Sequence, residues 1–526
     1  MAKSKTKTPE ERKKAKLYAE IDKWQGRIAR LMVFLLLCVH PLYLSSDRYI
    51  RLTWYKFEFF VIFMCVILFA AIIIWVVRLV SEPRLPPQGK LAITDCAILG
   101  FAAVTLISVL LSPFKEAAHL WVGVAERYDG AITQLLYIAI FFIVSRWYRQ
   151  RELDFMLFGV SAILVAAIGI LQFYGHDFLR LWPNDVPEYR ADNFYNIHFR
   201  STLGNTNIVS TYVSAAVILC GYLFVKVKSK WQPIWLVGSA LSFWMMLLAD
   251  ADSGRVGILA AIVLAIPFII ESGKVLGRFL ILGASWIAAL ALQLLLFDAN
   301  ILGTRTPESL IPYAGAACIL LAAGILLLIF RKKEPRHDGP IKWKLGVVLL
   351  AICIAGGIAG VELLGRREED SIDRGMIYQA REMMHGNVED WFGTNRVYIW
   401  RIGLEAFPHS PLAAVIGTGP DTFGFNFPGE AQGFYGERYD KAHNEYLQIL
   451  ICQGILGLLF YIVFIGGIFI KAIPKAYKNP LTMAILAAFI GYCAQAFFNI
   501  SLPIASQTLW VFAGILASNR PPLKAK

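Results

Sequence analysis

The chain has 526 residues, of which 57% are hydrophobic and only 17% are charged, and its formal net charge is +13. Soluble globular chains are roughly 45–50% apolar and roughly 25% charged, so this composition excludes an ordinary soluble protein. A basic chain can bind nucleic acid, but Lys and Arg also accumulate at the cytosolic flanks of membrane spans. We therefore expect membrane lipids, and no nucleic acid, as its surroundings.

Apolar blocks of about 20 residues recur along the chain, and each can cross roughly 30 Å of hydrocarbon as a helix. A strand barrel is disfavoured, because its segments are shorter and alternate in polarity. The sequence therefore predicts an all-α, polytopic integral membrane bundle with about 12–14 spans. The candidate spans are residues 31–44, 57–80, 92–112, 131–145, 153–174, 208–224, 233–248, 256–270, 279–297, 311–330, 345–364, 446–470, 481–500 and 504–517.

The positions of Lys and Arg predict the orientation of the bundle. Residues 1–27 form a basic tail, and the short loops on the same side as this tail are the basic ones, which favours a cytoplasmic N-terminus. The C-terminal tail then also ends in the cytoplasm. The expected organisation is a tail at 1–27, a bundle at 28–364, a large extracytoplasmic loop at 365–444, spans at 445–518 and a tail at 519–526.

Two extracytoplasmic segments, 175–207 and 365–444, are too long to be simple turns, and loops of this length are usually functional or disordered. The second is rich in aromatic residues, which argues against disorder. Within it Val397, Trp400 and Leu404 recur at helical spacing. We expect an amphipathic helix there that lies on the membrane surface or caps the bundle.

The segment Asp250-Ala-Asp-Ser-Gly-Arg255 joins two candidate spans on the extracytoplasmic side. Arg255 begins the second span, and an Arg at membrane depth usually faces a cavity or a counter-ion. Ser and Gly before a helix also leave N–H groups for an anion. The segment can be a phosphate clamp, or Arg255 can pair with a neighbouring carboxylate; position alone slightly favours the pair.

Arg200 is a second candidate cation beside a span, in Phe199-Arg-Ser-Thr-Leu-Gly-Asn-Thr-Asn207. Asn205 and Asn207 lie in the turn before the span. An ordinary helix cap beside one loop Arg explains this segment equally well when it is taken alone.

His443 lies where the long loop returns to the membrane, in Lys441-Ala-His-Asn-Glu-Tyr-Leu-Gln448. Imidazole is suited to proton transfer near neutral pH, and Glu445 and Gln448 are close enough in sequence to orient it. A polar helix start is the alternative interpretation. No group of His, Cys or paired carboxylates has metal-ligand spacing, so no metal ion is expected.

Two other segments of the long loop carry polar motifs. Gly417-Thr-Gly-Pro-Asp-Thr-Phe423 is glycine-rich but lacks the Lys-Ser/Thr pair of a P-loop, and a turn is the simpler interpretation. Arg396 and Arg401 fall on the polar side of the expected amphipathic helix, where a solvated face is the default.

Taken together, in this order and on one side of the membrane, these segments resemble the O-antigen ligase family, which is similar to the O-antigen and capsule polymerases. The resemblance spans roughly residues 129–458 and is strongest at 442–457. The segments that carry it are Arg200-Ser-Thr-Leu-Gly-Asn-Thr-Asn207, Asp252-Ser-Gly-Arg255, 396–400 with 411–423, and Ala442-His-Asn-Glu-Tyr-Leu-Gln448 with Gln453-Gly-Ile-Leu-Gly457.

The resemblance implies a C-type membrane glycosyltransferase that needs no metal and no other cofactor. Such proteins transfer a glycan from an undecaprenyl pyrophosphate carrier to an acceptor hydroxyl outside the cytoplasm, in the inner or plasma membrane. Carried onto this chain, Arg200 and Arg255 hold the pyrophosphate, and His443 acts beside the acceptor as base or orienting group. The implied substrate-binding residues are Arg396, Arg401, Asn205, Asn207, Asn444, Glu445 and Gln448.

Three alternatives stay open on the sequence. The acceptor can be a glycan, a lipid such as a lipopolysaccharide core, another cell-wall polymer or a protein. A polysaccharide polymerase would use similar residues with a carrier-linked acceptor. A small-solute or anion transporter is a different class, but transporters usually place charged residues at mid-bilayer, whereas here the polar candidates gather at the outer rim.

Overall fold

The computed structural model describes residues 8–81, 91–115, 119–182, 199–269, 272–297, 311–330, 341–367, 375–407, 409–427 and 439–520. Most of these residues are helical. The strands described are β1 (Phe199–Arg200) and β2 (Gly204–Asn205), which pair antiparallel with Phe199 opposite Asn205. The predicted all-α fold is confirmed.

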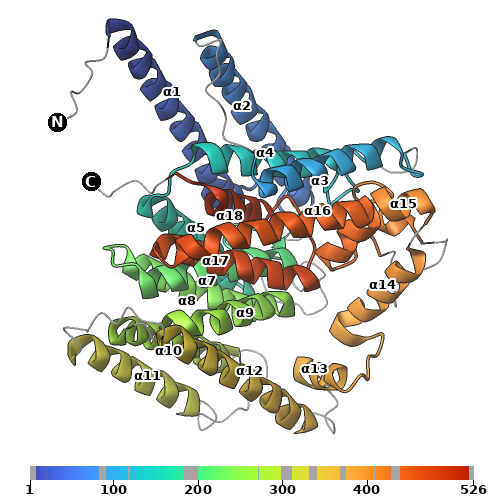
Figure 1. The fold of residues 1–526 in the computed structure, drawn as a ribbon. Coiled ribbons are helices and arrows are strands. Elements are labelled where there is room, and N and C mark those ends of the chain that lie inside the picture. The colour runs from blue at the N-terminus through green and yellow to red at the C-terminus, as the bar shows by residue number, and fades with distance from the viewer. Residues whose placement is uncertain are drawn as a thin grey trace.

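The first part of the chain forms long helices (Figure 1). The first of them, α1, runs on through a π-helical turn (Leu35–Val39) and a 3-10 turn (His40–Leu42), so the chain is already helical within the expected N-terminal tail. The helices are α1 (Pro9–Phe34), α2 (Leu52–Ser81), α3 (Ile93–Leu110), α4 (Ala131–Trp147), α5 (Glu152–Phe173), α7 (Thr206–Lys226), α8 (Gln232–Ala249), α9 (Asp252–Ile269), α10 (Gly273–Phe297), α11 (Ile311–Phe330) and α12 (Ile341–Arg367).

The long loop is folded where it is described, and it lies beside the bundle (Figure 1). The predicted amphipathic helix is α14, and Ile399 on it packs against the start of the next long helix, α16. Much of the other expected loop, at 183–198, and the stretch 428–438 lie outside the described residues. The remaining helices are α13 (Met376–Met384), α14 (Phe392–Ala406), α15 (Pro411–Ile416), a 3-10 turn (Phe423–Phe425), α16 (Glu445–Ala476), α17 (Pro480–Gln495), a 3-10 turn (Ala496–Phe498) and α18 (Gln507–Ala517).

Each predicted span falls on one of these helices. Ten helices in the described residues are long enough and apolar enough to cross a bilayer, and α4 and α18 are shorter apolar helices. α9 and α12 are helical as expected but are not among the ten. The protein is a polytopic membrane protein.

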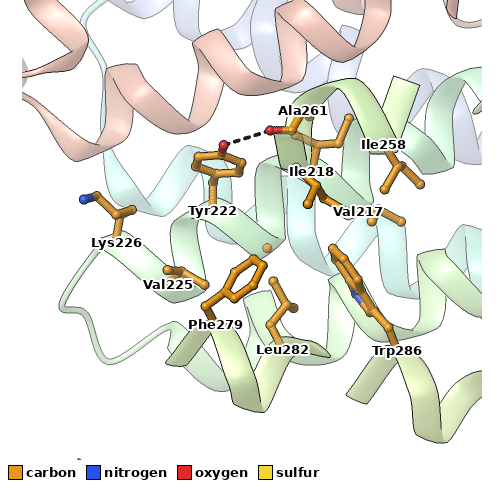
Figure 2. A pocket seen from close by; sticks show the side chains of 12 residues that line it. Val217, Ile218, Tyr222, Val225, Lys226, Ile258, Ala261, Phe279, Leu282 and Trp286 are labelled. Carbon is orange, nitrogen blue, oxygen red and sulfur yellow. Dashed lines mark hydrogen bonds between the residues drawn. The ribbon is translucent and has the colours of Figure 1, made fainter. Parts of the chain in front are cut away.

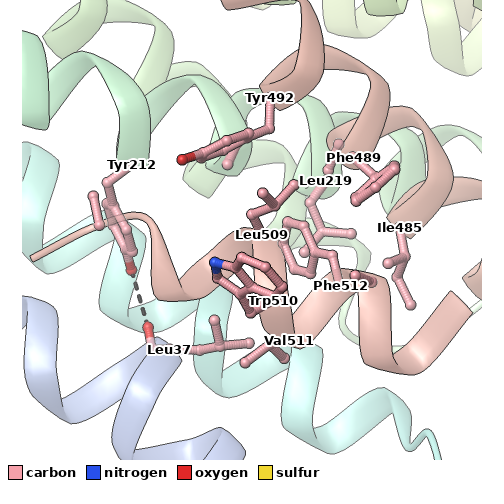
Figure 3. Packing of buried hydrophobic residues seen from close by; sticks show 14 of the residues in the cluster. Leu37, Tyr212, Leu219, Ile485, Phe489, Tyr492, Leu509, Trp510, Val511 and Phe512 are labelled. Atoms are coloured by element: carbon pink, nitrogen blue, oxygen red, sulfur yellow. Dashed lines mark hydrogen bonds between the residues drawn. The ribbon is translucent and has the colours of Figure 1, made fainter. Parts of the chain in front are cut away.

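The core lies where α7, α17 and α18 meet, with α7 buried along nearly its whole length. Figure 3 shows Leu219 of α7, Phe489 of α17 and Phe512 of α18 packed together. Trp510 stacks on Tyr137 of α4 with ring centroids 5.5 Å apart. Since lipid tails are as apolar as these side chains, close packing rather than exclusion of water stabilises the contacts between helices.

α9 and α17 approach each other through glycines. A Cβ added at Gly257 would lie 2.7 Å from the carbonyl oxygen of Gly491, and one at Gly491 would lie 3.1 Å from that of Gly257. The two backbones therefore touch, which fixes the height of α9 against α17 and with it the position of the α9 N-terminus.

We expect Gly257→Ala to push α9 from α17 and to destabilise the protein by about 1–3 kcal/mol, because the added methyl group meets backbone rather than a movable side chain. Thermal unfolding in detergent measures the effect as a lowered Tm. Gly356→Ala on α12 is the matched control, since nothing lies within 4 Å of its Cβ position. Equal Tm values for the two variants would contradict the tight α9–α17 contact.

Candidate functional site

His443 lies in the turn that leads into α16. Its backbone is left-handed, with φ +48°, a conformation that costs a residue with a side chain about 1–3 kcal/mol and clusters at functional sites. Asn444 then caps α16, because its side-chain oxygen accepts the N–H groups of Tyr446 at 3.0 Å and Leu447 at 3.1 Å. Nδ1 of His443 is shielded from solvent and has no hydrogen-bond partner among the described residues, so this nitrogen is available to a ligand.

The imidazole of His443 is in a cationic environment. Burial, together with the charges of Arg396 and Arg127, lowers the pKa of His443 to about 4, while Asp440 acts in the opposite direction. Both burial and a nearby positive charge disfavour the imidazolium form. His443 is therefore neutral at pH 7 and can accept a proton.

Arg396 lies on α14 beside this imidazole. Its side chain is nearly buried, and its Nη1 donates to the carbonyl of Gly393 at 2.6 Å and to the Thr394 hydroxyl at 3.3 Å. Its Nε is buried and has no hydrogen-bond partner in the part of the chain described. Burial lowers the pKa of Arg396, and the charge of Asp252 opposes that shift, so the first residue of α9 lies within electrostatic range of α14.

Arg255 lies one helical turn after Asp252 on α9. Its guanidinium group bridges Asp252 at 2.6 Å and Asp250 at 2.8 Å, and the Asp250 side chain is 86% exposed. Of the two alternatives that the sequence left open for Arg255, the structure shows the ion pair with neighbouring carboxylates. Arg255, Asp252 and Arg396 form a chain of charges that leads toward His443.

Arg200 lies in the small β1–β2 hairpin, next to the start of α7. It is 3% exposed, donates from Nη1 to the Phe199 carbonyl at 2.9 Å, and lies 5.7 Å from the ring centroid of Phe173. The contacts that can be described for Arg200 do not lead to His443. Its segment is joined to the α9 N-terminus instead.

The junction between α7 and α9 is Asn499. Its Nδ2 donates to the Asn207 carbonyl at 3.2 Å and to the Ser253 hydroxyl at 3.1 Å. Asn205 caps α7 by accepting the N–H of Asn207 at 2.9 Å. Asn499 therefore ties the start of α7, which follows the hairpin that carries Arg200, to the start of α9, which carries Arg255.

Glu445 and Gln448 point into the protein. Gln448 accepts the backbone N–H of Ala442 at 2.9 Å, so it supports the turn that carries His443. Buried Glu445 accepts the hydroxyls of Tyr461 at 2.5 Å and Tyr492 at 3.2 Å. Glu445 thereby joins the start of α16 to the later part of that helix and to α17.

Arg401 lies away from the other candidates, on the exposed side of α14. It pairs with Asp390 at 2.7 Å and with Glu405 at 3.0 Å, and all three side chains are about half exposed. These pairs raise the pKa of Arg401 and lower that of Asp390. The surroundings of Arg401 match the solvated face that the helical pattern favoured.

A break in α16 places the glycine-rich turn at 417–423. Gly454 has φ +70° inside α16, and a Cβ there would collide with the carbonyl of Val415. The break frees two helix carbonyls, which are satisfied from outside: the Thr418 N–H donates to Ile451 at 3.2 Å and the Gly419 N–H donates to Cys452 at 2.9 Å. The turn is thereby fixed to α16, as backbone groups buried in a bundle require.

The structure reveals charged residues that the sequence analysis did not single out. Lys441 is 1% exposed and lies between two carboxylates, Asp421 at 2.6 Å and Asp129 at 3.0 Å. Arg127 forms a two-pronged pair with Asp440, at 2.6 and 3.3 Å. Burial would lower the pKa of Lys441, but the charges of both carboxylates outweigh burial and raise it. The position of Lys441 two residues before His443 is the one local signal for it.

Two cavities lie near these elements. One, of about 30 Å³, is lined by both polar and apolar side chains, among them Asp129, Glu445 and Gln448. The other is lined mainly by apolar side chains between α7, α9 and α10 (Figure 2). It has Lys226 at its edge and Tyr222 donating to the Ala261 carbonyl at 3.1 Å, and it lies toward the end of α7 opposite Asn205.

The comparison with protein families gives one match: residues 308–462 match the family described as O-antigen ligase. This part of the chain is similar to that family. The comparison with curated proteins gives no match. The family resemblance read from the sequence is confirmed for this stretch.

The stretch that matches the family, residues 308–462, is called the O-antigen ligase stretch below. It covers α11 to α15 and the first half of α16. It therefore includes Arg396, Arg401 and the His443 turn with Asn444, Glu445 and Gln448. Arg200 and Arg255 lie outside it. Asn499, which also lies outside it, ties the start of α7, next to the hairpin that carries Arg200, to the start of α9.

We expect Arg396→Gln to raise the pKa of His443 from about 4 toward its ordinary value of about 6.5, since removal of a nearby positive charge stabilises the imidazolium form. Only neutral imidazole reacts with diethyl pyrocarbonate. Rates of modification at His443 are resolved by mass spectrometry between pH 4 and 7. As the pH is lowered, the rate in the variant should begin to drop at a higher pH than the rate in the wild type. The half-exposed His385 is the internal reference, and an unshifted His443 profile would refute the electrostatic coupling.

Proposed function

We propose that this protein is a membrane glycosyltransferase that passes a glycan from an undecaprenyl pyrophosphate carrier to an acceptor hydroxyl on the extracytoplasmic side. The observation that carries the proposal is the state of His443. It is a neutral imidazole with an unpartnered nitrogen, it lies in the O-antigen ligase stretch, and it is flanked by cations that suit a pyrophosphate.

In the proposed reaction the acceptor hydroxyl gives its proton to His443 while its oxygen attacks the first sugar of the glycan. The bond from that sugar to the pyrophosphate breaks, and the carrier leaves as undecaprenyl pyrophosphate with the electron pair on phosphate oxygen. A positioned general base contributes about 10²–10⁴-fold to such a step. The donor is already activated, so the reaction consumes no nucleotide.

Arg255 is suited to the leaving group. Guanidinium groups bind phosphate in a two-pronged geometry and stay charged at any relevant pH. Of its two carboxylate partners, Asp250 is the more exposed, so we propose that a phosphate oxygen replaces Asp250 while Asp252 keeps the guanidinium oriented. Arg396, whose Nε has no partner in the described residues, would meet the same anion from α14, and Arg200 would act from the α7 side.

The proposed topology places the N- and C-termini in the cytoplasm and the folded part of 365–444 outside. The positive-inside rule supports it, because the basic loops 226–230 and 471–478 fall on the cytoplasmic side. The His443 turn and the N-termini of α7 and α9 then share the outer rim. A carrier lipid in the outer leaflet could present its pyrophosphate there.

Reconstitution with a carrier-linked oligosaccharide tests the proposal and separates its alternatives. Release of undecaprenyl pyrophosphate together with glycosylation of a carrier-free acceptor indicates a ligase. Growth of the carrier-linked chain without another acceptor indicates a polymerase. Uptake of a labelled solute or anion into proteoliposomes without any turnover of the carrier would reject the proposal in favour of transport.

Replacement of His443 or Arg255 by Ala should abolish glycan transfer while the protein stays folded. We expect a loss of about 10²–10⁴-fold for His443→Ala, since a general base is removed, and of about 10²–10³-fold for Arg255→Ala, since a charge-stabilising group is removed. The readout is the initial rate of transfer in proteoliposomes. His385→Ala and Arg149→Ala, which remove a loop His bonded to Glu362 and an Arg paired with Asp22, are the controls. Full transfer in both test variants would defeat the mechanism.

A further inference from the structure

The backbone on either side of His443 is attached at several points to segments far away in the sequence. Before it, Asp440 binds Arg127 and Lys441 binds Asp129, both in the loop that precedes α4. The carbonyl of Ala442 accepts the indole N–H of Trp400 at 3.0 Å. After it, Asn444 caps α16. The ring itself has no hydrogen bond at Nδ1 to any described residue, so its position follows from its backbone.

Lys441 is the most deeply buried of these attachments. Its side chain and that of Asp421 are each 1% exposed, and its ammonium group lies between Asp421 and Asp129. These carboxylates come from two different segments. Asp421 belongs to the glycine-rich turn seated on the break in α16, and Asp129 belongs to the loop before α4. One ammonium group therefore joins three segments at a single point.

The loop before α4 is shaped to reach this point. The backbone N–H of Val124 donates to Asp421 Oδ2 at 2.7 Å, which orients that carboxylate toward Lys441. Gly123 has φ +99°, and a Cβ there would lie 2.6 Å from Asp421 Oδ2. Only glycine permits this approach, so the loop and the turn are built to share the carboxylate.

We propose that Lys441 is a positioning residue for His443: its ion pairs with Asp129 and Asp421 fix the backbone of the His443 turn, and thereby the place of the imidazole. This inference rests on the proposed function. A buried ammonium group needs its carboxylates at hydrogen-bonding distance, because burial removes the solvation that water gives to an exposed charge. The two ion pairs of Lys441 therefore favour one position of the His443 turn, because a shift of the turn would lengthen them. In catalysis a displacement of about 1 Å can cost about 100-fold.

Asp129→Asn and Asp421→Asn test the proposal without emptying the site. Each amide keeps the side-chain shape and leaves Lys441 one charged partner. Lys441→Met removes the charge itself and is the stronger variant. We expect kcat for glycan transfer to fall about 10- to 100-fold in these variants, with KM for the carrier-linked donor nearly unchanged.

Asp22→Asn is the matched control. Asp22 also lies between two positive charges, Arg149 at 2.8 Å and Arg520 at 2.6 Å. This pair of contacts is at the other end of the bundle, where α1 meets the α4–α5 loop and the residues after α18. Asp22→Asn should leave kcat unchanged. A loss that follows only the folded fraction, measured by thermal unfolding, would overturn the proposal, as would kcat within twofold of wild type in Lys441→Met and both Asn variants.

Modification of His443 by diethyl pyrocarbonate gives a readout that does not depend on activity. If Lys441 positions the turn, the rate at His443 should rise at least threefold in Asp421→Asn and Lys441→Met, while the rate at His385 stays constant. An unchanged rate at His443 in both variants would overturn the positioning role. A wild-type protein that transfers no glycan would refute the proposed function instead, and the modification rates would still decide the role of Lys441.

Discussion

The break in α16 at Gly454 is the constraint on which the site depends. A helix inside a membrane bundle must have its backbone groups satisfied by the protein itself. Because Gly454 is left-handed, the carbonyls of Ile451 and Cys452 accept hydrogen bonds from the turn at 417–423 instead of continuing the helix. That turn carries Asp421 to Lys441, and Lys441 lies two residues before His443. The position of His443 therefore depends on Gly454, which lies in the helix that follows it.

Two cations around the site, Arg255 and Lys441, each lie between two carboxylates. A charge removed from water is tolerated only with such partners. The Nδ1 of His443 and the Nε of Arg396 are among the buried polar atoms that have no hydrogen-bond partner in the described residues. A buried polar atom without a partner is costly, so a ligand that reaches both atoms recovers that cost. The same cationic surroundings keep His443 neutral, and an anionic substrate would raise its pKa on binding, which favours proton uptake when the leaving group is in place.

Much of the fold could be predicted because it depends on local composition. Each apolar block became a helix, and Val397, Trp400 and Leu404 correctly indicated α14. The number of spans could be predicted less well than the helices, since apolarity does not distinguish a helix that crosses the membrane from one that is only buried. At the site, His443 was proposed from its place at a helix start. Lys441 was not, because its partner Asp129 is 312 residues away and an ion pair at that separation leaves no periodic signal. Arg396 was placed on a solvated face by helical spacing, but the fold of the bundle against α14 buries it.

The candidate site combines residues from two parts of the chain, one inside and one outside the stretch that matches the O-antigen ligase family. The O-antigen ligase stretch supplies His443 and Arg396, whereas Arg255 comes from α9, which precedes it. What joins them is packing: Asn499 ties the start of α9 to α7, and the contact of Gly257 with Gly491 sets α9 against α17. Asp252 then lies close enough to influence the pKa of Arg396. Arg255 and His443, the proposed phosphate-binding charge and proton acceptor, can therefore meet only after α7, α9 and α17 have assembled, so residues far from them control whether the proposed site forms.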